Sequence, residues 1–478
     1  MGLQDGAAEP RWRRPHQWIL DRITLRARLT QLRFPEPEMC QSDTSSTPQW
    51  SDSEPDRRAD GRGYSENPFH LEKAEMVSEA FTGPQCSREV GLDQTRAAPY
   101  SISQAMSVET QIQWQRFFRA AGTVGESARF TWRVLRKQRH AFLYLPENSR
   151  FARHAITLYP AQTRMARTAR FALGVALRLH LPVVRERDQW SASAEDEFLE
   201  FMAGLAGLPP TALPTPAVLA GYPKGPGPRC LFLVDSGKAT PAAVVKAGSL
   251  PAARQLIQAE VDILSKLPAR LPGIPRTLAT FTSARVEALA QEYVAGDSPR
   301  THDPHRIAAI LTSWIGNSRT VRLSEIPAWQ RLAAVCGTMP HFAKLTGRLA
   351  HCTVHPVLYH GDFTPWNIKV SRPDRRWIML DWERGDVVGI PGWDWFHYII
   401  QHDTLVRRLT VEKLITDVEG LLASEPFQAY AQQAGISGIA RDLALGYALY
   451  DVTVHRPYQT LEFAKQLVDG FTTRWRLD

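Results

Sequence analysis

The sequence predicts an α+β protein in which a small antiparallel sheet lobe is followed by a larger helical lobe. Short apolar runs over residues 216–296 are separated by glycine and proline turns, which is typical of antiparallel strands. One helix over 252–267 is expected to interrupt these strands. From about residue 301 the pattern is helical apart from one hairpin, so the two lobes differ in their secondary structure.

The length of 478 residues allows roughly two to four structural units, and the composition is that of an ordinary globular protein. Lys and Arg number 57 against 49 Asp and Glu, and the resulting formal charge of +8 suits nucleotides, nucleic acid or acidic lipid alike. The cysteines are odd in number, with no C-x-x-C, which favours a reducing compartment. No apolar run has the length of a membrane span or the position of a signal peptide, so a cytoplasmic protein is expected.

The chain ahead of the sheet lobe divides by composition. Residues 1–105 are rich in Ser, Pro and charged residues without helical or strand periodicity, and are expected to form a disordered extension. Residues 106–205 are expected to form a mainly helical N-terminal region, with one short extended stretch over 141–146. The sheet lobe then covers 206–297 and the helical lobe covers 298–478.

A basic helix is expected over about 162–180. At 100° per residue, Arg164, Arg167, Arg170 and Arg178 fall within an arc of about 120°. A solvated face on a packed helix is favoured over contact with acidic lipid, because the apolar residues opposite are not unusually bulky. Peripheral membrane contact is the less favoured alternative.

The most informative stretch is residues 357–385. Asp362 and Asn367 lie on a loop that precedes an expected hairpin of strands 368–370 and 377–380, which ends at Asp381. A hairpin returns the chain to its start and paired strands lie about 4.8 Å apart, so Asp381 is expected beside Asn367. These two oxygen ligands suit Mg²⁺. Asp362 is left to accept a hydroxyl proton, which is the division of roles that phosphoryl transfer requires.

The order H-G-D-x-x-x-x-N, apolar strand, L-D-W-E resembles the aminoglycoside phosphotransferase and choline kinase branch of the protein-kinase-like fold. The resemblance covers about residues 216–478 and implies a two-lobed kinase-like fold that uses ATP and Mg²⁺. It places His360, the first residue of the motif, at the catalytic centre with Asp362. It also implies that Asp394, in GIPGWDWFHY, braces the catalytic loop.

The same resemblance assigns residues in the sheet lobe. In kinase-like folds, a lysine on a strand holds the α- and β-phosphates and pairs with a glutamate on the following helix. Lys246 ends an expected strand, and Glu260 follows fourteen residues later in the expected helix, so the resemblance assigns these two roles to them. Glu292 and Val294 belong to the segment whose backbone is expected to meet the adenine. The expected phosphate-covering loop, residues 222–229, lacks G-x-G-x-x-G and is equally consistent with a plain turn.

The leading functional hypothesis is ATP-dependent transfer of a phosphoryl group to a hydroxyl of a small molecule, such as a sugar, an amino-alcohol or an aminoglycoside-like compound. Asp386, Trp393 and Trp395 are candidates for the acceptor cleft, although core packing is favoured for the tryptophans. The alternative is a catalytically silent kinase-like scaffold that binds nucleotide. Nucleic-acid binding is not expected, because no motif of a recognised module is present.

Overall fold

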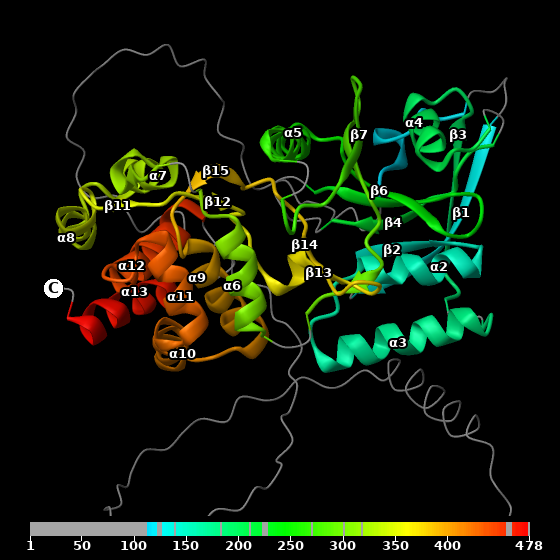
Figure 1. The fold of residues 1–478 in the computed structure, drawn as a ribbon. Coiled ribbons are helices and arrows are strands. Elements are labelled where there is room, and N and C mark those ends of the chain that lie inside the picture. Colours follow the sequence, from blue (N-terminus) through cyan, green and yellow to red (C-terminus); the bar gives the residue numbers. More distant parts are fainter. Residues whose placement is uncertain are drawn as a thin grey trace, which may run out of the picture. The chain divides into compact units, whose positions relative to one another are not determined.

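A computed structural model of the chain describes residues 112–121, 127–137, 140–181, 184–209, 212–221, 228–268, 271–299, 302–316, 319–455 and 461–476. All of them belong to one compact unit, Leu71–Asp478. The extension expected over 1–105 lies outside the described residues, as do residues 222–227 of the expected phosphate-covering loop. The expected α+β architecture is confirmed: Figure 1 shows a sheet-rich part and a helical part of this unit.

One antiparallel sheet forms the first lobe, with the strand order β3-β1-β2-β4-β5-β6-β8-β7. The predicted strands between residues 216 and 296 are present as β4 to β8. The eight strands are β1 (Ser127–Lys137), β2 (His140–Pro146), β3 (Arg187–Ser193), β4 (Ala217–Ala220), β5 (Cys230–Asp235), β6 (Pro241–Gly248), β7 (Thr277–Thr282) and β8 (Glu287–Gln291).

Residues 106–205 supply strands β1, β2 and β3 to this sheet, although only the stretch over 141–146 was expected to be extended. In β1, Phe130, Trp132 and Val134 are buried while the residues between them are half-buried, which is the period of two of a strand with one buried face. A helix would point these three bulky side chains in different directions. Strand β2 pairs with β4 through Leu143 and Leu219, so the sheet continues across residue 206.

Helices cover both faces of the sheet. On one face, α4 (Glu197–Ala206) and the 3-10 helix η1 (Trp114–Arg116) pack in an aromatic cluster, where the rings of Trp114 and Trp132 stack at 4.3 Å. On the other face lies α2 (Ser149–Ala155), followed by the 3-10 helix η2 (Ile156–Leu158). The basic helix is present as α3 (Arg164–Arg178), which lies beyond α2 as the lowest element of this lobe in Figure 1.

The second lobe packs its helices around one large aromatic and aliphatic core. Trp393 and Trp395 are fully buried in it, in agreement with the core-packing role favoured from the sequence. Its helices are α6 (Pro304–Ser313), α7 (Pro327–Cys336), α8 (Pro340–Leu349), α9 (Trp393–His402), α10 (Val411–Ala423), α11 (Glu425–Ala434), α12 (Ala440–Tyr450) and α13 (Leu461–Trp475). Short elements join them: η3 (Leu323–Glu325), η4 (Pro365–Asn367), the π-helical turns η5 (Asp403–Arg407) and η6 (Asp451–His455), β10 (Val321–Arg322), β11 (Thr353–Val354), β12 (Val357–Tyr359) and β15 (Asp386–Gly389).

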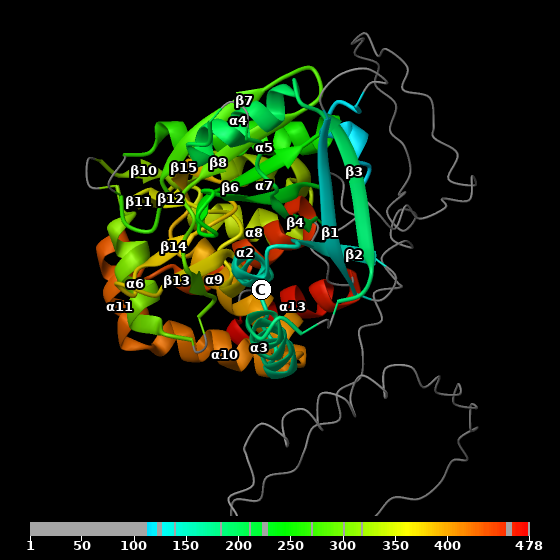
Figure 2. The same cartoon turned by 90° about the vertical axis from the view of Figure 1, so that its right-hand side faces the viewer.

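Two predicted elements position the site. Helix α5 (Pro251–Lys266) packs against β6 and β8, as expected for residues 252–267. The predicted hairpin is present as β13 (Ile368–Ser371) and β14 (Trp377–Met379), with Ile368 opposite Met379. Strand β13 also pairs with β9 (Gly296–Asp297), which follows the sheet lobe directly, and Figure 2 shows the hairpin beside α2.

The segment between α2 and α3 contacts both the hairpin and the connection between the lobes. The backbone oxygen of Thr157 accepts a hydrogen bond from Lys369 of β13 at 2.6 Å, and the Thr157 hydroxyl lies 3.1 Å from that of Tyr293. Arg170 of α3 forms an ion pair with Asp297 at 2.5 Å. The N-terminal region is therefore part of the two-lobed unit. Among the described helices, none combines the length and apolar character needed to cross a bilayer.

Candidate active site

The loop that carries Asp362 is held by Asp394. The carboxylate of Asp394, in the first turn of α9, accepts hydrogen bonds from the backbone N–H groups of His360 at 2.8 Å and Gly361 at 3.0 Å. Burial raises the pKa of Asp394 to about 7, although the two backbone donors oppose that shift. The bracing contact expected of Asp394 is present.

His360 is fully buried beneath the same loop. Its Nδ1 accepts a hydrogen bond from the backbone N–H of Asp362 at 3.2 Å, and its Nε2 lies 3.0 Å from the carbonyl oxygen of Leu380. These partners assign the proton to Nε2. Burial lowers the pKa of His360 to about 4, so the ring is neutral at physiological pH. The sequence hypothesis placed His360 at the catalytic centre, whereas its contacts support the loop.

Gly361 turns the chain sharply between these two contacts. Its φ is +78°, and a Cβ there would lie 2.5 Å from the carbonyl oxygen of Arg384. We expect Gly361→Ala to destabilise the fold by about 1–3 kcal/mol and to lower turnover, because Asp362 would be displaced. Thermal unfolding and kinetics check this, with Gly347→Ala as the control, since a Cβ at Gly347 meets nothing within 4 Å. An unchanged melting temperature and turnover for Gly361→Ala would contradict it.

The Asp362 carboxylate has a partner on each oxygen. Its Oδ1 lies 2.9 Å from Nε2 of His397, and its Oδ2 accepts a hydrogen bond from Nδ2 of Asn367 at 3.1 Å. Burial alone would raise the pKa of Asp362, but the His397 hydrogen bond and the charges of His397 and Arg384 outweigh it, and the net pKa lies well below its usual range. Asp362 is therefore a fixed carboxylate.

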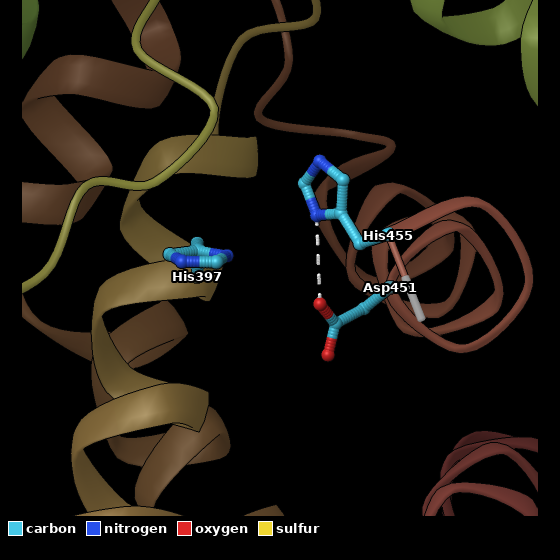
Figure 3. A group of neighbouring side chains, drawn as sticks. All are labelled: His397, Asp451 and His455. Carbon is cyan, nitrogen blue, oxygen red and sulfur yellow. Dashed lines mark ion pairs between the residues drawn. The ribbon is translucent and has the colours of Figure 1, made fainter. Parts of the chain in front are cut away.

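His397 and its neighbours form a polar cluster behind Asp362. The Nδ1 of His397 lies 2.5 Å from the hydroxyl of Tyr447, so both ring nitrogens have partners. Figure 3 shows His455 and Asp451 beside it, with Nδ1 of His455 3.6 Å from Oδ1 of Asp451. The ligand atoms of these three residues lie within 4.8 Å of one another. A metal ion there would have to displace one hydrogen-bond partner of His397, which disfavours a metal site, although Nδ1 of His455 has no hydrogen-bond partner among the described residues.

His397 is not among the site residues predicted from the sequence. It lies three residues after Asp394 on α9, so the two side chains share a helix face and reach the same loop. This three-residue spacing from Asp394 is the feature of the sequence from which a role for His397 at the loop could have been predicted.

The phosphate side of the site is built around Lys246. Its ammonium is ion-paired with the fully buried Glu260 and lies 2.5 Å from Oδ1 of Asp381. Lys246 stands in the interior of the sheet, where its strand β6 pairs with β5 and β8, and Glu260 comes from α5. The ion pair expected between Lys246 and Glu260 is thus present, and Asp381 joins it.

Two further charged residues belong to this group and were missed. The carboxylates of Glu260, Asp381 and Glu383 lie within 4.8 Å of one another. Arg229, immediately before β5, forms an ion pair with Glu383 and lies 3.7 Å from Asp381. Two cations face three carboxylates, so one negative charge is left over and a divalent cation fits the charge of the group. Asp381 is the only carboxylate ligand predicted from the sequence, and Glu383 is a second candidate.

Asp381 is held in an unusual backbone conformation. Its φ of +73° lies in the left-handed region, which costs non-glycine residues about 1–3 kcal/mol and is retained where surrounding contacts enforce it. The hydrogen bond from the N–H of Leu380 to the carbonyl oxygen of Asn367, at 2.7 Å, closes the hairpin immediately before it. Since Asn367 donates its Nδ2 to Asp362, its Oδ1 is the atom left to act as a ligand.

The connection between the lobes contains Glu292 and Val294. Glu292 donates its N–H to the carbonyl oxygen of Arg276 at 3.0 Å, and its carboxylate lies 3.7 Å from the Arg276 guanidinium. Its side chain is therefore engaged with Arg276. Among the described residues, neither the C=O of Glu292 nor the N–H and C=O of Val294 has a backbone partner, so these groups could meet a base.

No family model and no curated protein matches this chain. Similar solved structures include a thermostable mutant of aminoglycoside phosphotransferase APH(4)-Ia in a ternary complex with ADP and hygromycin B, at 13% identity and a TM-score of 0.39, covering 57% of this chain and 97% of that one. They also include a proposed fructosamine-3-kinase from Haemophilus somnus, at 13% identity and a TM-score of 0.35, covering 57% of this chain and 95% of that one. A third is the streptomycin–ATP–APH(2")-IIa ternary complex, at 14% identity and a TM-score of 0.33, covering 54% of this chain and 90% of that one. The chain is similar to small-molecule kinases. At these TM-scores the similarity is weak, and the function proposed below rests on the side chains of the site.

Proposed function

We propose that the protein is an ATP-dependent phosphotransferase that moves the γ-phosphoryl group to a hydroxyl of a small molecule. The observation that supports this is that one loop and the hairpin after it carry two different groups of functional side chains. Asp362 is an ionised, oriented carboxylate at one end, and Asp381 joins Lys246 in a charged group at the other. Phosphoryl transfer needs a group that orients the nucleophile and charges that stabilise the phosphates.

The nucleotide would be bound by the charged group. Lys246, fixed by Glu260, would exchange its contact with Asp381 for the α- and β-phosphate oxygens. Asp381, Glu383 and the Oδ1 of Asn367 would hold Mg²⁺, which neutralises phosphate charge when bound. The backbone of Glu292 and Val294 would meet the base, as the sequence resemblance implies.

Asp362 would act on the acceptor. Its carboxylate would accept the hydroxyl proton as the new O–P bond forms and the bond between the β-phosphate oxygen and the γ-phosphorus breaks, with ADP leaving. Hydrogen bonds from His397 and Asn367 fix its orientation, so no reorganisation is needed at that moment. The acceptor would be a sugar, an amino-alcohol or an aminoglycoside-like compound.

A nucleotide screen followed by acceptor profiling tests this proposal. Thermal unfolding with ATP or GTP, with and without Mg²⁺, should show stabilisation that depends on the metal. Labelled ATP with a panel of hydroxyl compounds should then show transfer to one class. Metal-dependent nucleotide binding without transfer to any compound would favour the catalytically silent scaffold, and the absence of nucleotide binding would refute both functions.

His397 is expected to position Asp362 and to keep it ionised. His397→Leu should lower kcat by roughly 10–100-fold and leave the Kd of Mg·ATP within a few-fold, because the hydrogen bond to Asp362 is lost while the phosphate side is intact. The loss of this hydrogen bond also raises the pKa of Asp362, so the acid limb of kcat/KM should move to higher pH. Steady-state kinetics from about pH 3 to pH 9, which includes the ordinary pKa range of an aspartate, measures both effects.

His397→Gln is the matched control for this prediction, because its amide nitrogen can donate from nearly the position of Nε2. It should recover much of the turnover and return the acid limb toward lower pH. Equal losses in both variants, without any change in the pH profile, would show that His397 only fills space.

A further inference from the structure

Helix α3 presents apolar side chains that no described residue covers. Met165, Phe171 and Leu179 are 55%, 73% and 60% exposed, the last at the C-terminal cap of the helix. They are three of the five large apolar residues exposed in the described chain; the others are Val335 and Val387. Single exposed apolar residues are ordinary, but three on one helix form a patch.

Basic residues flank this patch. At 100° per residue, Arg164 and Arg178 lie within about 20° of Phe171, one on either side, and both are exposed. The helix carries no acidic residue. Arg170 does not share this face, because its side chain is 15% exposed and pairs with Asp297. Within the stripe expected from the sequence, Arg170 therefore faces the protein, whereas Arg164 and Arg178 face the solvent.

The fold uses only the inner face of α3. Leu173 and Leu177 pack against α2 in the cluster beneath the sheet, and Thr163 caps the helix N-terminus with a hydrogen bond to Ala166 at 3.1 Å. The exposed apolar residues of the outer face do not belong to this cluster. Their exposure also departs from the expectation of a solvated polar face.

We propose that the outer face of α3 docks on the surface of an anionic lipid bilayer. Phe171, Met165 and Leu179 would enter the boundary between headgroups and acyl chains, and Arg164 and Arg178 would meet the lipid phosphates. A helix of fifteen residues is about 22 Å long and can lie along a planar surface. A second copy is disfavoured, because pairing this face with itself would bring arginines together.

Vesicle flotation of the full chain tests this proposal, which does not depend on the proposed function. The protein should float with vesicles of phosphatidylcholine and phosphatidylserine, much less with phosphatidylcholine alone, and less in high salt. Phe171→Ser combined with Leu179→Ser should lower partitioning by at least about tenfold, because two apolar side chains no longer enter the bilayer. Val335→Ser, an equally exposed apolar residue on α7, should leave it unchanged.

A second pair of variants separates a local effect from net charge. Arg164→Glu with Arg178→Glu should abolish flotation, whereas Arg322→Glu with Arg441→Glu, which changes the net charge equally at other exposed sites, should largely preserve it. No flotation of the unmodified chain, or equal losses in the two pairs, would overturn the proposal. So would self-association of the unmodified chain that Phe171→Ser abolishes, since the face would then bind a second copy.

Discussion

Asp362→Asn is expected to lower kcat by roughly 10²–10⁴-fold, because the substitution removes the carboxylate proposed to accept the proton of the acceptor hydroxyl. The amide keeps the size of the side chain and can still contact Asn367 and His397, so the loop should keep its shape. The Kd of Mg·ATP should stay within a few-fold, since Lys246 and Asp381 are untouched. Turnover on the identified acceptor and calorimetric titration with nucleotide measure the two quantities.

Asp386→Asn is the matched control for this variant. Asp386 is a half-buried carboxylate on β15 that lies 3.7 Å from Arg331. Its loss should cost little turnover, and a large loss would identify it as an acceptor contact instead. Near-normal turnover of Asp362→Asn would remove Asp362 from the proposed mechanism. A parallel fall in thermal stability and nucleotide affinity would show that Asp362 only stabilises its loop.

The second large effect is expected at Asp381. Asp381→Asn should abolish the dependence of nucleotide binding on Mg²⁺, because it removes the carboxylate shared by Lys246 and the proposed metal site. The fold should survive, since asparagine tolerates a positive φ and Lys246 keeps Glu260. Glu383→Gln should weaken metal dependence to a lesser degree, because Asp381 remains.

Titration with ATP in Mg²⁺ and in chelator measures this dependence. Asp374→Asn serves as the control, because Asp374 is an exposed carboxylate in the turn of the same hairpin. Wild-type affinity of Asp381→Asn for Mg·ATP would show that Asp381 does not bind the metal. A loss in Glu383→Gln as large as that in Asp381→Asn would instead make Glu383 an equal ligand.

The parts of the fold that the sequence predicted are those specified by local spacing. The hairpin after Asn367 and the helix that carries Glu260 follow from short runs of apolar residues between turn residues. The alternation of Phe130, Trp132 and Val134 was equally local and was overlooked. These residues lie on β1, which pairs with β2 and β3. Strand β2 connects β1 to the rest of the sheet through β4.

The site residues that were not predicted are brought together by contacts between segments far apart in the sequence. Arg229 reaches Glu383 across more than 150 positions, and nothing near Arg229 in the sequence marks that partner. His397 meets Asp362 because α9 crosses behind the loop. Arg170 faces the protein, where it pairs with Asp297, which is far along the chain. Periodicity places a residue on a helix face, and only the packed structure decides which face is covered.

The pairing of β2 with β4 also bears on how this chain can be divided. A fragment that began at residue 206 would keep all the proposed catalytic residues but would expose the backbone N–H and C=O groups of β4 along an open sheet edge. It would also lose Thr157, whose backbone and hydroxyl hold Lys369 and Tyr293. The portion from residue 206 onward is therefore not a detachable module, because the preceding strands cover the edge of its sheet.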